Sequence, residues 1–387
     1  MIRQDNWFSV WVLSVDTFRG MQVATLFCMR TPRLSLAFLV LILASACSRA
    51  PERQETSVRQ PSPAAQTRPS YVFTTDEGAN ALSRIDLSKG EVRSFPLPIR
   101  PHNVQASADG RHVVVAGPVV TSGGGHEEHG APSGMPGRLF VIDTQSMDVA
   151  KAVVVDIGPN PAHVVVNGDT TRAFVTDSGT NRVQLIDLAQ RKIVSEVPTG
   201  RYPHGLRLSP DGATIAVANL QDNTVSLIDI ASARESARVP VGKAPVQVAW
   251  APDGNSVYVS LRDEDAVASV DVTKRRKTAS VRVGDGPIQL YVSPDGRALY
   301  AANEGTEEGP ATTVSVIDTG KMRVVHTIEA GRGPHGIVIT PDGKRVFVTN
   351  RFDDTVSEID SAGPRVVRTY GVGDEPTGIT YAPAVDH

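Results

Sequence analysis

The sequence has little cysteine, few aromatic side chains and almost no excess of charge. Its 387 residues include two cysteines, Cys28 and Cys47, too few for a disulfide scaffold or for a zinc cluster of thiolates. Aromatic residues make up 5%, and Trp250 is the one tryptophan after residue 11, so platforms for stacking bases or sugars are scarce. The formal net charge of -3 argues against a protein that binds nucleic acid through its phosphates.

Familiar catalytic motifs and helical patterns are also missing. The sequence contains no GxSxG nucleophile elbow, no GxxxxGK phosphate loop and no CxxCH haem-attachment site. No segment shows a sustained 3.6-residue period with helix caps, so helices should be almost absent. With 40% apolar and 21% charged residues, the composition is that of a folded protein with a sizeable core.

From Tyr71 onward the sequence repeats itself about every 42 residues. An aspartate that closes an alternating apolar strand recurs at Asp86, Asp143, Asp187, Asp229, Asp271, Asp318 and Asp360. A proline that opens another strand recurs at Pro101, Pro161, Pro203, Pro245, Pro287, Pro334 and Pro376. One repeat predicts four short strands, at 333–339, 345–350, 354–360 and 365–372. Seven repeats predict an all-β protein, a seven-bladed β-propeller with four antiparallel strands per blade.

The two ends of the repeat region indicate how the ring closes. Residues 375–381 form a first strand with no second strand behind it, and residues 71–74 form a second strand with no first strand before it. Together they complete one blade, which hides two strand edges. Each of the seven aspartates precedes a turn, where its carboxylate can cap backbone N–H groups, so we expect these residues to be structural.

Two kinds of segment carry a resemblance to a known family. Tyr258-Val-Ser260 and Phe347-Val-Thr-Asn350 recur with Pro-Asp-Gly turns, as at 341–343. These features resemble the bacterial YVTN-type propeller repeat, and the resemblance extends from residue 71 to about 383. It implies the fold and says little about function, because propellers carry many unrelated activities.

Residues 29–47 have the layout of a secretory signal, with a basic start, an apolar run over 34–46 and small residues before Cys47. The ending Leu-Ala-Ser-Ala-Cys resembles a bacterial lipobox, which implies lipidation of Cys47; the alternative is a signal peptide cleaved near Ala46. Ser48 follows in place of the aspartate that retains lipoproteins at the inner membrane. We therefore expect a periplasmic protein anchored by lipid, most simply to the outer membrane.

These observations divide the chain into three parts. Residues 1–47 are an upstream extension plus the lipoprotein signal peptide, with Met29 as the expected true start. Residues 48–69 are rich in Pro, Ser, Gln and Thr and predict a flexible tether. Residues 70–387 are the propeller.

The order of strands places the residues after each repeated proline at one mouth of the central channel. The polar residues at these positions are His102, Asn103, His163, His204 and His335. They predict a ligand-binding rim for a metal or an anionic molecule. The alternative is that each histidine packs against the neighbouring blade or bonds to its backbone.

The longest insertion, at about 117–137, is expected on the same face of the propeller. It contains His126-Glu127-Glu128-His129 among glycines. Imidazole and carboxylate groups suit copper(II) and zinc, so His126, Glu127 and His129 are predicted metal ligands. The alternative is a solvated loop without a ligand.

The leading hypothesis is a lipid-anchored, monomeric periplasmic propeller that binds a protein or a small ligand at this top face and acts as a binding or scaffold module. Pro101-His102-Asn103-Val104 is also similar to the Pro-His repeats of propeller lactonases, where His, Arg and Glu at the channel mouth hydrolyse sugar lactones. Val246 and Ile288 at neighbouring rim positions argue against such a dense charged set. A third hypothesis is a respiratory accessory protein, akin to the propellers that hold haem or copper in nitrite and nitrous oxide reductases.

Overall fold

The computed structural model describes residues 10–18, 21–29, 69–120 and 136–384. The chain divides into two compact units, Met1–Ala64 and Ala65–His387. In the first unit, β1 (Val10–Phe18) pairs antiparallel with β2 (Met21–Met29). In the described part of the chain, no helix is both long enough and apolar enough to cross a membrane.

The segments predicted to direct secretion and lipid anchoring lie outside the described residues. This applies to the apolar run of the signal segment, to Cys47 and to almost all of the predicted tether. The start at Met29, the lipidation of Cys47 and the periplasmic location therefore stay predictions.

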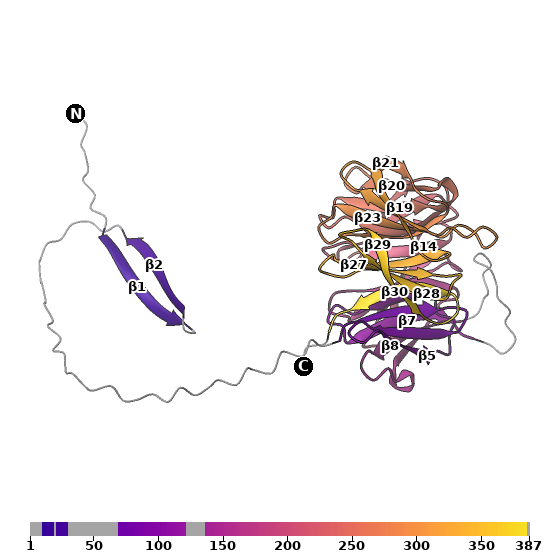
Figure 1. Ribbon diagram of the computed structural model, residues 1–387, viewed down its shortest axis with the longest axis horizontal. Coiled ribbons are helices and arrows are strands. Elements are labelled where there is room, and N and C mark those ends of the chain that lie inside the picture. The colour runs from indigo at the N-terminus through magenta and orange to yellow at the C-terminus, as the bar shows by residue number, and fades with distance from the viewer. Residues whose placement is uncertain (1–9, 19–20, 30–68, 121–135, 385–387) are drawn as a thin grey trace, which may run out of the picture. The chain divides into compact units, whose positions relative to one another are not determined.

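The second unit consists of seven four-stranded antiparallel sheets (Figure 1). The first strands are β6 (Asn103–Ala106), β10 (Pro161–Val166), β14 (Pro203–Leu208), β18 (Pro245–Trp250), β22 (Pro287–Val292), β26 (Pro334–Ile339) and β30 (Pro376–Ala382). The second strands are β7 (His112–Pro118), β11 (Arg172–Asp177), β15 (Thr214–Asn219), β19 (Ser256–Leu261), β23 (Ala298–Asn303), β27 (Arg345–Asn350) and β3 (Tyr71–Asp76).

The two outer strands of each sheet follow in sequence. The third strands are β8 (Gly137–Asp143), β12 (Arg182–Asp187), β16 (Thr224–Asp229), β20 (Ala266–Asp271), β24 (Thr313–Asp318), β28 (Thr355–Asp360) and β4 (Ala81–Asp86). The fourth strands are β9 (Val153–Ile157), β13 (Lys192–Pro198), β17 (Arg234–Pro240), β21 (Arg276–Arg282), β25 (Arg323–Glu329), β29 (Arg365–Gly371) and β5 (Glu91–Pro96). The described residues add two short 3-10 turns, Val149–Lys151 and Arg262–Glu264, as expected for a nearly helix-free chain.

Contacts between first strands close the ring. Each first strand contacts the first strands of both neighbouring sheets, and the series returns from β30 to β6. The sheet order β30-β3-β4-β5 joins the C-terminal strand to the N-terminal ones, with Tyr71 opposite Ala382. The prediction of a seven-bladed all-β propeller, with its last blade shared between the two ends, is confirmed.

The core lies between neighbouring sheets and explains the sequence pattern of each strand. The second and third strands are buried on both faces, so they read as nearly continuous apolar runs. One such layer packs Leu227 of β16 against Val248 and Val257 of the next blade, all three buried. Burying one such side chain contributes about 1.5–3 kcal/mol. The fourth strands alternate between exposed and partly buried residues, because only one of their faces meets the core.

The repeated aspartates cap turns, as their positions predict. Asp86 Oδ1 accepts hydrogen bonds from the backbone N–H groups of Ser88 and Lys89 at 2.9 and 3.2 Å. The other six aspartates accept equivalent backbone bonds in their own turns. These carboxylates are therefore part of the fold.

Candidate functional site

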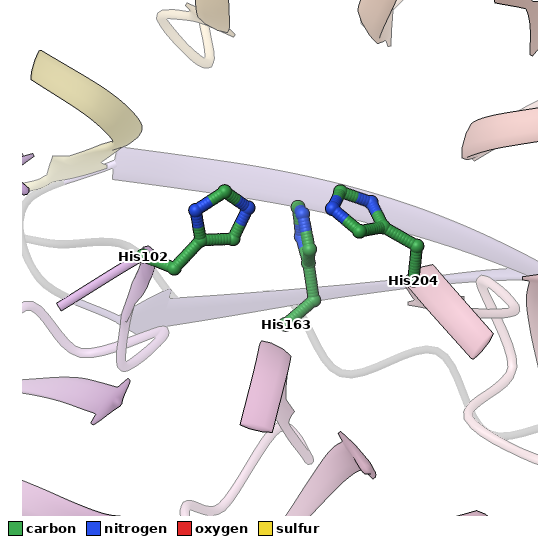
Figure 2. Close-up of side chains that lie close together, drawn as sticks. All are labelled: His102, His163 and His204. Carbon is green, nitrogen blue, oxygen red and sulfur yellow. The ribbon is translucent and has the colours of Figure 1, made fainter. Parts of the chain in front are cut away.

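Four histidines lie together at one mouth of the channel, each contributed by a different sheet. His163, His204 and His335 belong to the first strands β10, β14 and β26, and His102 directly precedes β6. We call this set the histidine mouth. Figure 2 shows the rings of His102, His163 and His204 turned toward one another. All four side chains are buried.

The distances between the rings show how tightly they gather. The His163 and His204 ring centroids are 4.8 Å apart. Those of His102 and His204 are 5.3 Å apart, and those of His102 and His163 are 5.4 Å apart. His335 stands 5.9 Å from His102. The four positions are those that the strand order predicts for the rim.

Two of the histidines are paired with carboxylates through their Nδ1 atoms. His102 Nδ1 is 2.9 Å from Glu77 Oε2, and His335 Nδ1 is 3.0 Å from Glu304 Oε1. A carboxylate accepts hydrogen bonds, so Nδ1 carries the proton and Nε2 carries the lone pair in a neutral ring. His335 Nε2 is buried and has no hydrogen-bond partner among the described residues. A carboxylate on one ring nitrogen and a lone pair on the other is the arrangement of a metal-binding histidine.

The other two histidines contact the blade of β18. His204 Nδ1 lies 3.2 Å from the carbonyl oxygen of Val246, and His163 Nδ1 lies 3.4 Å from Gln247 Nε2. A Cβ added at Gly205 would come within 2.3 Å of Gln247 Oε1, so glycine is needed for this close approach of the strands. Burial, together with the neighbouring His204 and His102, lowers the pKa of His163 well below 6.5. His163 is therefore neutral at pH 7, and its Nδ1 lone pair accepts the hydrogen bond from Gln247 Nε2.

The bonds of His204 agree with the alternative reading that a rim histidine bonds to the backbone of the next blade. Asn103 does so as well, because its Oδ1 accepts a hydrogen bond from Val164 N–H at 3.3 Å. Asn103 is thus occupied by the joint between two blades. The predicted loop ligands His126, Glu127 and His129 lie outside the described residues.

A charged shell surrounds the histidines. Glu77 Oε1 lies 3.5 Å from Arg100 Nε, and Glu304 Oε1 lies 3.5 Å from Arg351 Nη1. The sequence-based argument that the mouth lacks a dense charged set was wrong. It considered only the residues after each proline, whereas Glu77, Glu304 and Arg351 directly follow second strands. A comparison of the residue after each second strand across the repeats would have identified these charged side chains.

The donor set fits a transition-metal ion. One ligand nitrogen from each of His102, His163 and His204 lies within 4.8 Å of the other two. Zinc–nitrogen bonds of about 2.0–2.1 Å place tetrahedral ligands about 3.4 Å apart, so these nitrogens would approach one another by up to about 1.4 Å to hold an ion. A cavity of about 90 Å³, lined in part by His204, His335 and Glu304, adjoins the rings and has room for a further small ligand.

The fold and this arrangement define the class of the protein as a seven-bladed β-propeller with a histidine-lined channel mouth. Residues 305–387 match the YNCE-like β-propeller family. Antigen Lp49 of Leptospira interrogans is 27% identical over 150 residues, which are 38% of this chain. The chain spans 30% of the length of that relative.

Solved structures are similar in fold over most of the propeller. Kuenenia stuttgartiensis hydrazine synthase matches with a TM-score of 0.60 and 18% identity, covering 76% of this chain and 97% of that one. A protein of unknown function from Desulfotomaculum acetoxidans matches with a TM-score of 0.67 and 17% identity, covering 81% and 99%. A candidate 6-phosphogluconolactonase of Bacteroides fragilis matches with a TM-score of 0.62 and 16% identity, covering 83% and 99%. At these identities the likeness shows the fold alone.

Proposed function

We propose that this protein is a lipid-anchored binding propeller of the bacterial periplasm whose histidine mouth holds a copper or zinc ion. The observation that carries the proposal is the convergence of imidazole nitrogens from His102, His163 and His204. Imidazole suits both metals, and copper(II) generally binds such a set more tightly than zinc does. His335, with its buried Nε2, is the natural fourth ligand.

The surroundings favour a bound cation over a set of packed rings. Glu77 and Glu304 lie behind two of the ligands, His102 and His335, and their hydrogen bonds to Nδ1 fix the ring orientation. His163 stays neutral because burial lowers its pKa, so a metal does not have to displace a proton from it at pH 7. The cavity beside His204 leaves space for a small ligand or a group of a partner protein to reach the ion.

Titration calorimetry with copper(II) and with zinc tests the proposal on the full chain. We expect one tight site per chain, weakened at least a hundredfold in His163→Ala and in His204→Ala. His326→Ala is the matched control, because His326 is an exposed histidine of β25, and should bind as the wild type does. Unchanged affinity in both mouth variants would reject the site.

The loop ligands predicted at His126, Glu127 and His129 are tested in the same titration. A His126→Ala/His129→Ala double variant should retain the tight site if the histidine mouth is sufficient. Loss of binding in the double variant, together with unchanged binding in the mouth variants, would assign the metal site to the loop.

The anchoring part of the proposal rests on the lipobox-like ending at Cys47. Cys47→Ser should abolish labelling by a fatty acid and release the protein from the membrane fraction. Labelling of the variant, or a wild type found wholly in the soluble periplasmic fraction, would contradict it. We also propose that the protein is a monomer and that a protein or a small ligand binds at its top face.

Lactone hydrolysis is a second candidate, favoured by one observation. His102 with Glu77 forms a carboxylate-oriented imidazole suited to activating water, and Arg100 could bind an anionic sugar lactone beside it. A lactone hydrolysis assay with and without metal separates the two candidates. Activity that is lost in His102→Asn and unaffected by a chelator would favour the hydrolase.

A further inference from the structure

The channel has a second opening, and its chemistry differs from that of the histidine mouth. A cavity of about 410 Å³ is lined by residues near the ends of the first strands, away from their opening prolines. Arg207, Trp250, Tyr291 and Tyr381 are among them. We call this set the arginine mouth. A volume of this size falls within the range of small-molecule sites, about 300–1,000 Å³.

Arg207 is the one charged side chain among the described residues that line this cavity. Its Nη1 donates a hydrogen bond to the carbonyl oxygen of Leu206 at 3.0 Å. Among the described residues, no carboxylate contributes to the electrostatic environment of this guanidinium. Burial lowers the pKa of Arg207, and the Tyr291 hydroxyl acts in the opposite direction. A guanidinium that lines a cavity without a counter-ion is a group that an anion would satisfy.

The walls around Arg207 are aromatic and apolar. Trp250 Nε1 donates to the carbonyl oxygen of Arg207 at 3.0 Å, which fixes the indole ring next to the arginine. Tyr291 comes from the following blade and is partly buried, and Tyr381 comes from the closing strand β30. Such walls accept a flat apolar body, while the guanidinium fixes one charged end.

We infer that the arginine mouth binds a small organic carboxylate with a flat apolar body. The planar guanidinium presents two parallel N–H groups that match the two oxygens of one carboxylate. One cation matches one negative charge, so a monoanion is favoured over a phosphate dianion, which would need a second cation. The site is independent of the metal proposal, because it uses neither the histidines nor their carboxylates.

Calorimetry with 2-naphthoate on the full chain tests this inference. We expect 2-naphthoate to bind one site per chain, and Arg207→Gln to weaken it at least tenfold. The neutral 2-naphthamide should bind at least tenfold more weakly than the acid, and inorganic phosphate more weakly still. Arg234→Gln, which changes an exposed arginine at the start of β17, is the matched control and should leave binding unchanged.

Copper titration of the same variants keeps the two sites separate, since Arg207→Gln should bind metal as the wild type does. If that variant does not fold, Arg207→Lys keeps the charge but loses the two-pronged geometry and should weaken 2-naphthoate at least threefold. Three results would overturn the inference: no binding of 2-naphthoate at about 10 mM, equal affinity in the wild type and the Arg207 variant, or equal affinity for acid and amide.

Discussion

The two mouths of the channel are built from the same strands and carry opposite chemistry. β14 contributes to both, with His204 at one end and Arg207 at the other. The histidine mouth gathers four imidazoles, two of them paired with carboxylates, which suits a cation. The arginine mouth holds one guanidinium among aromatic rings, which suits an anion. The repeat fixes where the strands lie, and a few positions on each strand decide what each mouth can bind.

Protonation should separate the two mouths most strongly. Metal binding requires neutral imidazoles, whereas the arginine stays charged over the accessible pH range. Because protons and a metal ion compete for the same imidazole lone pairs, metal binding should weaken as the pH falls from 7.5 to 5.5. His163 adds little to this loss, because its pKa is lowered. Binding of 2-naphthoate should change less than twofold over the same interval.

Calorimetry at the two pH values measures both halves of this prediction. A metal affinity that stays constant down to pH 5.5 would show that imidazoles are not the ligands. A fall in naphthoate binding parallel to that of the metal would show that the two mouths are coupled.

A second contrast is between the buried carboxylate of Asp76 and the amides that occupy the same position in other blades. Asp76 ends β3, next to Glu77, and burial raises its pKa from 3.8 to about 6. Asn219, Asn303 and Asn350 occupy the same position in other blades and donate to hydroxyl groups of the third strands. Asp76→Asn should therefore stabilise the protein at pH 8 by about 3 kcal/mol, the free-energy equivalent of this pKa shift.

The sign of the pH dependence follows from the raised pKa. Between pH 3.8 and about 6 the folded protein holds a proton on Asp76 that the unfolded chain has released. The stability due to this proton is present at low pH and is lost as the pH rises through about 6. Denaturant unfolding of the wild type and Asp76→Asn should give similar stabilities at pH 4, which diverge as the pH rises to about 6 and stay apart above it. A variant that is less stable at pH 8 would contradict this account.

Neutralising the carboxylates that pair with His102 and His335 should have the smallest of the three effects predicted in this comparison. Glu77→Gln and Glu304→Gln keep the shape of the side chain but remove the charge that orients His102 and His335. Loss of such a partner weakens metal binding by about 10- to 100-fold. Neither variant should alter binding at the arginine mouth. Metal titration that gives wild-type affinity for both variants would show that the carboxylates are structural only.

Most of the fold could be predicted from the sequence, because its information is repeated. The strand that opens with Pro and the strand that closes with Asp each occur seven times, so the same blade is predicted seven times. The incomplete repeats at the two ends predict how the ring closes. The aspartates were correctly assigned to turns because an Asp directly before a turn has one common role.

The site was only partly predictable, because it depends on contacts between blades. The position after each proline revealed His102, His204 and His335, and the next position revealed His163. Glu77 and Arg351 follow strands of different blades and come close to the rim histidines only when the ring has closed. No pattern within a single repeat predicts this proximity. The arginine mouth was missed for the same reason: Arg207 is one polar residue in an apolar strand, and its isolation becomes visible only when the walls of the cavity are in place.

The measurement that tests the central claim most directly is X-ray absorption at the zinc edge of the zinc-loaded full chain. The histidine mouth predicts a first shell of three or four imidazole nitrogens at about 2.0–2.1 Å, with the outer-ring scattering of histidine. His163→Ala should reduce this imidazole count or abolish binding. A shell of oxygen or sulfur alone, or an unchanged imidazole count in His163→Ala, would contradict the assignment of the metal to this mouth.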